Sequence, residues 1–187
     1  GVAVLDSESL QPVPWDGETM GEVMFRGNIA MKGYLKNEAA SREAFRGGWF
    51  HSGDLAVVYP DGYLRIKDRS KDIIISGGEN VSSIEVEAAL YQHPAVGTAA
   101  VVAALHDKWG ETPVAAVVLR TQGGVGADEL RDWINARVGA KYQRVDRVLL
   151  RDEFPRNTAG KTLKRELRAP FWDGQVTAIH STPGRSS

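Results

Sequence analysis

The stretch that decides the fold reads Lys67-Asp68-Arg69-Ser70-Lys71-Asp72-Ile73-Ile74-Ile75-Ser76-Gly77-Gly78-Glu79-Asn80. Its first six residues are charged or carry a hydroxyl, so we expect them to face solvent or a ligand. The β-branched run at residues 73–75 predicts a buried strand. Gly77 and Gly78 allow backbone angles that residues with a Cβ resist, which predicts a turn. The stretch therefore predicts a joint between a solvent-facing segment and a core.

Before the joint the pattern is rich in β structure. The expected elements are strands at 2–5 and 21–27, a helix at 37–45, and a hairpin of strands 49–58 and 63–67 around the turn Tyr59-Pro60-Asp61-Gly62. Asn37 is the expected N-cap of the helix. Gly1 starts directly in strand-like sequence, so we expect the chain to derive from a longer protein.

After the joint the pattern becomes helical. Residues 82–91 open with a capping box of Ser82 and Glu85 and show helical apolar spacing at Ile84, Ala88 and Tyr91. Strands are expected at 96–105, 114–119 and 147–150, and helices at 128–138 and 162–168. This order predicts an α+β domain with a mixed sheet and packed helices, followed by a polar, disordered tail at 173–187.

The composition of the 187 residues limits the class of protein. Apolar residues make up 42%, and 23 Lys and Arg nearly balance 24 Asp and Glu, so the net charge of −1 gives no reason to expect nucleic acid as a partner. The chain has no cysteine, which excludes disulfides and thiolate chemistry. It shows neither a signal peptide nor an apolar run of about 18 residues, so we expect a soluble, cytoplasmic protein.

Two candidate nucleotide contacts flank the predicted hairpin. Asp54 follows a glycine at a strand entrance, where its carboxylate suits a vicinal diol such as ribose; the alternative is a turn aspartate that caps backbone amides. Arg69 and Lys71 lie two residues apart and share one side of an extended segment, or else form a solvated face. His51 has no triad or metal-ligand spacing, and we interpret it as structural.

Two further sets lie beyond the joint. Residues 155–162 form a loop that ends in Gly160-Lys161-Thr162, but Pro155 stands where a P-loop needs its first glycine, which excludes a Walker-type site. Lys161 still suits a phosphate or carboxylate as a point charge. Trp109 with Tyr142 and Arg144 suits stacking on a purine and pairing with a phosphate, the alternative for Trp109 being core packing.

Taken in order, these segments resemble the C-terminal third of the acyl-adenylate-forming superfamily, which comprises acyl-CoA synthetases, luciferases and the adenylation domains of peptide synthetases. The motifs that carry the resemblance are Gly21-Glu22-Val23 with Gly27, Gly33-Tyr34, Trp49-Phe50-His51-Ser52-Gly53-Asp54, Asp68-Arg69-Ser70-Lys71-Asp72, Gly77-Gly78-Glu79-Asn80, and Pro155 with Gly160-Lys161. Residues 24–34 are most similar to medium-chain fatty acyl-CoA synthetases and related acid–CoA ligases.

The resemblance implies two half-reactions. A carboxylic acid, in this subfamily a fatty acid, reacts with ATP to form acyl-AMP and pyrophosphate, and the thiol of CoA then displaces AMP. Asp54 and Arg69 are the implied ribose contacts, Lys71 is the hinge, and Lys161 is the catalytic lysine that bridges carboxylate and phosphate. Mg²⁺ is expected with the ATP, but no metal ligand is expected in this chain.

The implied CoA contacts are Gly77 and Gly78, which line the path of the thiol arm, together with Trp109, Tyr142 and Arg144. One departure concerns the residues after Arg144, where relatives often carry a basic, proline and basic series and this chain has Val145 and Asp146. In relatives this basic series contacts the CoA phosphate, so the departure affects that contact in this chain.

The resemblance also implies the domain organisation. Residues 1–70 correspond to the β-rich end of a large, truncated domain and residues 71–172 to a mobile lid domain. We expect this chain alone to be inactive and to self-associate through exposed strand edges. The alternatives are a stand-alone, non-catalytic module that binds nucleotide or a partner, and the adenylation domain of a peptide synthetase.

Overall fold

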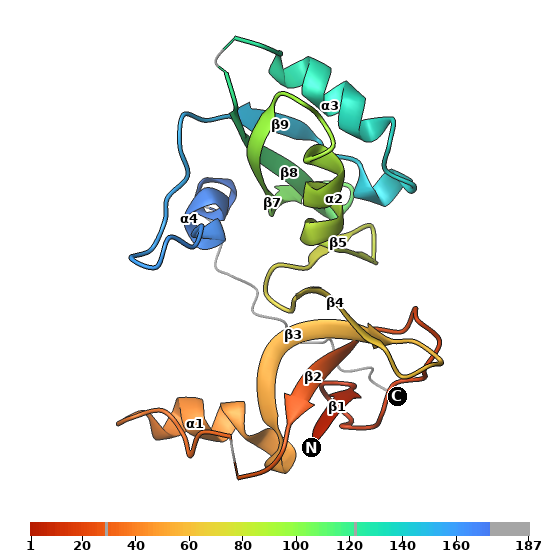
Figure 1. Cartoon of the computed structure of the whole chain (residues 1–187), viewed down its shortest axis with the longest axis vertical. Coiled ribbons are helices and arrows are strands. Elements are labelled where there is room, and N and C mark those ends of the chain that lie inside the picture. The colour runs from red at the N-terminus through yellow and green to blue at the C-terminus, as the bar shows by residue number, and fades with distance from the viewer. Residues whose placement is uncertain (29, 122, 173–187) are drawn as a thin grey trace. The chain divides into compact units, whose positions relative to one another are not determined.

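The computed structural model describes residues 1–28, 30–121 and 123–172, so the predicted tail at 173–187 lies outside the described residues. The chain divides into two compact units (Figure 1). Unit 1 comprises Gly1–Ile73 together with Ser82–Glu85, and unit 2 comprises Ile74–Val81 and the residues from Val86 onward. The first boundary between the units therefore falls inside the isoleucine run of the joint.

Unit 1 is a four-stranded antiparallel sheet in the order β1-β2-β3-β4. Its strands are β1 (Val2–Leu5), β2 (Gly21–Phe25), β3 (Phe50–Val58) and β4 (Leu64–Arg69). Alternate side chains of each strand lie on the same face of the sheet. Five valines and alanines form the core of the unit: Val4, Val13, Val23, Ala56 and Val58. The predicted strands are confirmed within one or two residues at their ends.

Two local predictions in unit 1 are confirmed. The helix α1 (Glu38–Ala44) is capped by Asn37, whose Oδ1 accepts the N–H of Ala40 at 3.0 Å. A short 3₁₀ turn, η1 (Arg46–Gly48), follows it. The hairpin between β3 and β4 closes where Gly62 N donates to Tyr59 O at 2.8 Å.

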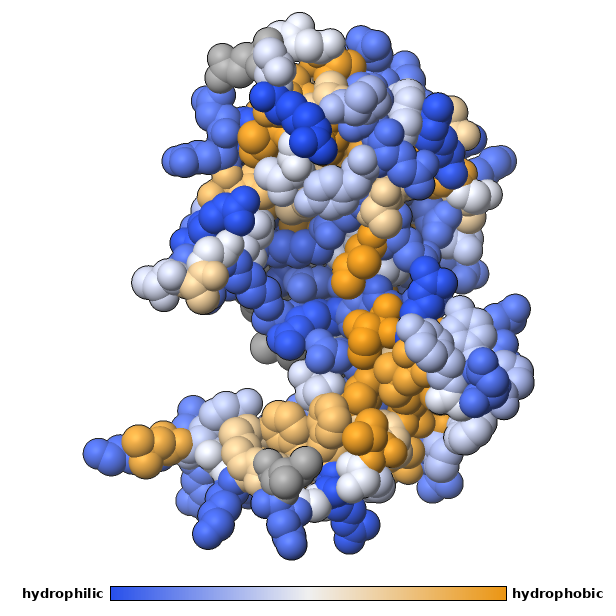
Figure 2. Space-filling model, in the orientation of Figure 1, coloured by the Kyte–Doolittle hydropathy of each residue, from blue (hydrophilic) through white to orange (hydrophobic). Residues whose placement is uncertain are grey.

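Apolar side chains also reach the surface of unit 1. Figure 2 shows apolar residues gathered over the part of this unit where β2, β3 and α1 lie. Leu35 is 91% exposed, and Val2 and Phe25 are exposed as well. An exposed apolar surface of this kind is consistent with the expected self-association, which stays a prediction.

Unit 2 is built on a mixed sheet, as predicted, in the order β6-β5-β8-β7 with β9 parallel to β8. Its strands are β5 (Ile74–Ser76), β6 (Glu79–Val81), β7 (Val96–His106), β8 (Gly110–Leu119) and β9 (Arg147–Leu150). The strand β6 was not expected, because two of its three residues are polar and exposed. It forms because it pairs with β5 through a tight turn at Gly77 and Gly78.

Helices cover both faces of this sheet. The residues of β7 alternate, so that Ala99, Val101 and Ala103 pack with α2 (Ser83–Leu90) and α3 (Ala127–Asn135) in the main core. Ala100, Val102 and Ala104 face the other way, toward Phe154, α4 (Lys164–Arg168) and η3 (Ala169–Phe171). The α+β architecture is therefore confirmed, with the helices divided between two faces.

The predicted buried face of α2 is wrong. Ile84, Ala88 and Tyr91 lie outward, whereas Val86 and Leu90 are buried. The orientation is set by contacts that spacing alone does not reveal, because the Ser83 hydroxyl is buried in a hydrogen bond at the start of the helix. Of the predicted capping box, the bond from Glu85 N to Ser82 Oγ is present at 3.3 Å, but the Glu85 carboxylate pairs with Lys67 instead.

Three side chains cover the outer edge of β7, which ends the sheet among the described strands. The bonds run from Ala99 N to the Tyr91 hydroxyl (3.1 Å), from Val101 N to Glu87 Oε1 (2.8 Å), and from Trp172 Nε1 to Ala103 O (3.0 Å). Glu87 also pairs with Lys164 at 2.6 Å, which links α2 to the start of α4. Backbone groups that the sheet leaves unpaired are satisfied in this way.

Candidate functional site

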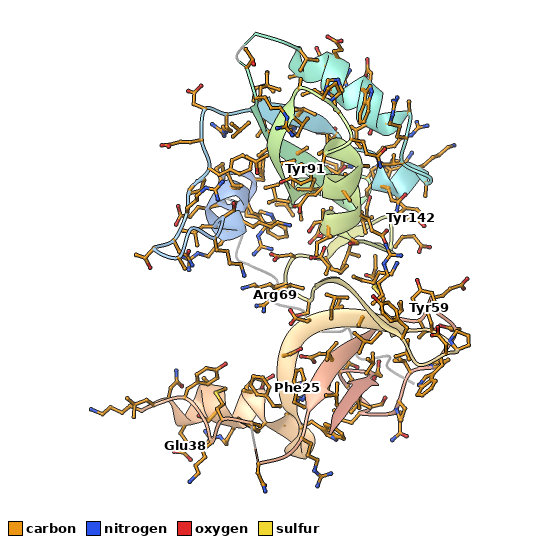
Figure 3. All side chains as sticks on the ribbon, viewed as in Figure 1. Phe25, Glu38, Tyr59, Arg69, Tyr91 and Tyr142 are labelled. Carbon is orange, nitrogen blue, oxygen red and sulfur yellow. The ribbon has the colours of Figure 1, made fainter. Side chains whose placement is uncertain are left out.

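The two predicted nucleotide contacts lie beside each other in unit 1. Asp54 on β3 is in register with Arg69 on β4, and Asp54 Oδ1 lies 2.8 Å from Arg69 Nε. The two side chains are 34% and 42% exposed, so they form an ion pair at the surface (Figure 3). A carboxylate and a guanidinium side by side offer acceptors and donors to a vicinal diol.

A bulge in β3 presents Asp54. Glu22 on β2 pairs with Leu55, and Met24, two residues further, pairs with His51 four residues away on β3. Residues 52–54 of β3 therefore face the single residue between Glu22 and Met24, and they arch away from β2. The arch needs Gly53, whose φ of +75° lies in the left-handed region.

Partly buried polar contacts hold the two strands together at this bulge. The Ser52 hydroxyl donates to Val23 O at 2.6 Å, and the Gly53 N–H donates to Glu22 Oε1 at 2.8 Å. His51 contacts Glu22 Oε2 through Nδ1 at 2.8 Å. His51 thus belongs to a hydrogen-bond network and has no nucleophile beside it among these contacts, in keeping with its structural interpretation.

Sequence reasoning missed Glu22 as a residue of this site. The signal was present, because Glu22 is a charged residue in an otherwise apolar strand. Charged side chains are rarely buried unless they are paired, and Glu22 is only 7% exposed. A carboxylate inside such a strand therefore indicates a partner that the sequence does not name.

The joint itself differs from expectation at Asp68. Instead of facing solvent it is 2% exposed, and its Oδ2 accepts the N–H and the hydroxyl of Ser83 at 2.6 and 2.7 Å. The expectation was wrong because a buried carboxylate at a helix start is satisfied by the free N–H groups there. After Arg69 the chain turns, since Arg69 O accepts the N–H groups of Asp72 and Ile73 at 2.9 and 3.0 Å. Lys71 lies within this turn.

The two glycines of the joint form the turn between β5 and β6. Their φ angles are +63° at Gly77 and +86° at Gly78, both in the left-handed region. A Cβ at Gly77 would lie 2.8 Å from Cε3 of Trp109, whereas at Gly78 no described atom lies within 4 Å of that position. Gly77 N also donates to Trp109 O at 2.8 Å, so the loop between β7 and β8 lies over this turn.

The predicted CoA contacts come from adjoining segments of unit 2. Trp109 is 42% exposed, which shows that the core-packing alternative is wrong for this side chain. Tyr142 lies in η2 (Lys141–Gln143), followed directly by Arg144, and η2 contacts both β6 and β8 (Figure 3). Exposed aromatic and basic side chains are thus placed near the glycine turn.

Lys161 lies on the other side of unit 2, in the loop before α4 (Figure 1). Asn157 organises this loop, because its Oδ1 accepts the N–H groups of Ala159 and Lys161 at 3.0 and 2.8 Å. Asn157 N also donates to Lys161 O at 2.9 Å. Lys161 is exposed, so an ordered loop presents its ammonium group to solvent. Lys161 and Gly77 are not brought together.

Two structural features expected of other protein classes are absent from the described part of the chain. No group of three or more His, Asp or Glu side chains there is arranged to hold a metal ion. No described helix has the length and apolar character needed to cross a membrane.

Comparison with protein families gives one match. Residues 85–161 match the AMP-binding enzyme C-terminal domain. The matched residues run from the first turn of α2 to Lys161, and they include Trp109, Tyr142 and Arg144.

Curated relatives match a longer part of the chain. The acetate–CoA ligase of Humulus lupulus is 49% identical over 174 residues, which cover 90% of this chain and 30% of that enzyme. The peroxisomal benzoate–CoA ligase of Arabidopsis thaliana is 46% identical over 177 residues, covering 89% of this chain and 30% of the relative. This chain thus spans about a third of the length of such relatives.

Solved structures show the same fold. ATP-bound MatB from Rhodopseudomonas palustris superposes with a TM-score of 0.83 at 30% identity, covering 92% of this chain and 34% of that one. The o-succinylbenzoate CoA synthetase of Bacillus subtilis, solved with its acyl-adenylate intermediate, gives a TM-score of 0.78 at 37% identity over 89% of this chain and 33% of that one.

Proposed function

The chain belongs to the acyl-adenylate-forming superfamily, whose C-terminal domain it carries, and we propose that it is part of an AMP-forming acid–CoA ligase. The enzyme activates a carboxylic acid with ATP as acyl-AMP and then transfers the acyl group to CoA. The observation that carries the proposal is that Lys161, in the loop before α4, and the Gly77 turn, beside Trp109, lie apart on unit 2. Two sites on one unit suit two successive half-reactions.

In the first half-reaction, Asp54 and Arg69 bind the ribose of ATP. The carboxylate accepts hydrogen bonds from the two ribose hydroxyls while the guanidinium, held 2.8 Å away, orients it and donates to the same sugar. The Asp54 side chain is 34% exposed and that of Arg69 is 42% exposed, so both are partly accessible to a ligand.

Lys161 is the catalytic residue of adenylation. Negative charge accumulates where the acid's carboxylate attacks the α-phosphate, and an ammonium group placed there offsets it. The loop that Asn157 organises supports this role, since a preordered group loses little freedom at the moment of reaction.

In the second half-reaction, the Gly77–Gly78 turn lines the path of the CoA thiol arm. The space beside Gly78 is open, whereas the Trp109 ring lies against Gly77, so the arm passes over Gly78 and along the exposed indole. Tyr142 and Arg144 contact the CoA nucleotide. Lys71, in the turn after Arg69, is the hinge about which the lid domain of residues 71–172 rotates relative to the β-rich part at 1–70.

ATP and CoA are therefore the proposed cosubstrates. Mg²⁺ accompanies the ATP, with ligands outside the described residues of this chain, and a Bacillus relative is solved with ATP and magnesium. A fatty acid is the proposed acyl substrate, although the named relatives act on acetate, butyrate and benzoate. The proposed location is the cytoplasm; fluorescence microscopy of the tagged complete protein, with a peroxisomal marker beside it, tests this.

The test separates the two half-reactions in the complete enzyme. Lys161→Ala is expected to reduce ATP–pyrophosphate exchange by about 10²–10³-fold and to spare thioester formation from supplied acyl-AMP. Lys32→Ala, which removes an exposed lysine from unit 1, is the matched control. Equal loss of both steps in Lys161→Ala contradicts the proposed role.

Two alternatives receive less support. A stand-alone, non-catalytic module and the adenylation domain of a peptide synthetase are both disfavoured by relatives that are named as CoA ligases across 88–90% of this chain.

A further inference from the structure

We propose that Glu22 and His51 are positioning residues of the nucleotide site, because the Glu22 carboxylate holds the β3 bulge that presents Asp54. The inference rests on the proposed function, since it concerns how the ribose contact is kept in place. Neither residue touches the Asp54 side chain in any described hydrogen bond; they act through the backbone of the bulge.

Glu22 supplies an acceptor that the bulge in β3 lacks. Residues 52–54 have lost their register with β2, so the N–H of Gly53 has no strand partner there. Glu22 Oε1 supplies one at 2.8 Å. A partly buried N–H without an acceptor is costly, so the carboxylate favours this arch over a regular strand.

Backbone hydrogen bonds couple Asp54 to Gly53 and its neighbours. The Asp54 N–H donates to Ser52 Oγ at 3.0 Å, and Gly53 O accepts the N–H of Ser70 at 2.8 Å. Asp54 is thus bonded to Ser52 across Gly53, and Gly53 itself is bonded to the chain after Arg69. A shift of Gly53 therefore moves the backbone of Asp54 directly.

His51 links the Glu22 carboxylate to the backbone before β3. His51 Nδ1 lies 2.8 Å from Glu22 Oε2, and His51 Nε2 lies 3.1 Å from the carbonyl oxygen of Arg46. Both ring nitrogens of His51 thus lie at hydrogen-bond distance from an oxygen atom, so the ring connects the Glu22 carboxylate to the backbone at Arg46 and limits how far the carboxylate can move.

This arrangement defines an informative pair of variants. In Glu22→Gln the amide oxygen can still accept from Gly53 N and the amide NH₂ can still contact His51 Nδ1, so both contacts are kept while the carboxylate is removed. In Glu22→Ala the Gly53 N–H loses its acceptor. The two variants therefore separate the hydrogen bond to the bulge from the charge of the carboxylate.

The first experiment uses the 187-residue chain and needs no ligand. Amide hydrogen exchange at Gly53 is expected to quicken by roughly tenfold or more in Glu22→Ala and to stay within about twofold of wild type in Glu22→Gln. Unchanged exchange at Gly53 in Glu22→Ala overturns the proposal. If Glu22→Ala does not fold, His51→Ala, which leaves the Glu22–Gly53 bond in place, is expected to quicken the exchange less than tenfold but measurably.

The second experiment measures ATP affinity in the complete enzyme, with Asp54→Ala as the reference. Glu22→Ala is expected to weaken ATP binding by roughly tenfold, and the double variant is expected to bind no more weakly than Asp54→Ala alone, because both changes remove the same contact. Additive losses overturn the positioning role. If Asp54→Ala itself leaves ATP affinity unchanged, the ribose role in the proposed function fails, and the exchange experiment still decides what Glu22 does to the bulge.

Discussion

Replacing Gly77 by alanine tests the contact between the glycine turn and Trp109. A residue with a Cβ at the left-handed φ of +63° costs about 1 kcal/mol. The new Cβ would also lie 2.8 Å from Trp109 Cε3, well inside the usual carbon–carbon separation of about 3.5 Å. The half-exposed indole must swing away, and a displaced rotamer costs about 1 kcal/mol more. We expect Gly77→Ala to lower the free energy of unfolding by about 2 kcal/mol.

Gly78→Ala is the matched control. Its φ of +86° imposes the same kind of backbone strain, but no described atom lies within 4 Å of the added Cβ. The expected loss is therefore only about 1 kcal/mol. Urea denaturation of the 187-residue chain, followed by circular dichroism, measures both values, and Trp109→Ala as a background completes a double-mutant cycle.

In the Trp109→Ala background the cost of Gly77→Ala is expected to fall to that of Gly78→Ala, because the ring that obstructs the Cβ is gone. Equal costs for the two alanines in the presence of Trp109, or a cost at Gly77 that persists without the ring, would refute this reasoning. In the complete enzyme, Gly77→Ala is further expected to slow thioester formation more than adenylation.

Two further predictions concern unit 1. Asp68→Ala removes the buried acceptor of the Ser83 N–H and hydroxyl, and we expect a loss of about 3 kcal/mol in the free energy of unfolding, measured by urea denaturation; a loss below 1 kcal/mol would contradict the structural role of this carboxylate. The hydroxyl and N–H of Thr19 lower the pKa of Asp16 from 3.8 to about 2, so the contribution of this group to stability is present above pH 3.8 and is lost as the pH falls toward 2. Thr19→Val is expected to raise the pKa of Asp16 toward 3.8, and an NMR titration that still gives about 2 would refute the assigned cause.

Much of the fold follows from local patterns in the sequence. The turn at residues 59–62, the cap at Asn37 and the apolar runs of β7 and β8 predict their elements because hydrogen bonds and burial there depend on residues close in sequence. The pairing of Asp54 with Arg69 does not follow from the turn alone. A regular hairpin would place Asp54 opposite Asp68, and the register shift between Leu55 and Ala56 brings Arg69 there instead.

The remaining features depend on contacts between segments far apart in the sequence. The polar strand β6 exists only through its pairing with β5, and the buried face of α2 is set by Asp68, fifteen residues before Ser83. Glu22 likewise acts on Gly53, 31 residues away. Apolar spacing carries no information on such partners. It therefore predicts a solvent-facing Asp68 and names no partner for Glu22, although both carboxylates are buried acceptors.

The covered edge of β7 has a consequence for how this domain behaves in a crowded solution. A bare edge strand offers N–H and C=O groups that recruit a strand from another molecule and can start a growing fibril. At residues 99, 101 and 103 those groups are already bonded to Tyr91, Glu87 and Trp172, three side chains from two ends of the domain. Loss of the Trp172 side chain would reopen one of these positions, so the indole also protects the edge of β7 against templated aggregation.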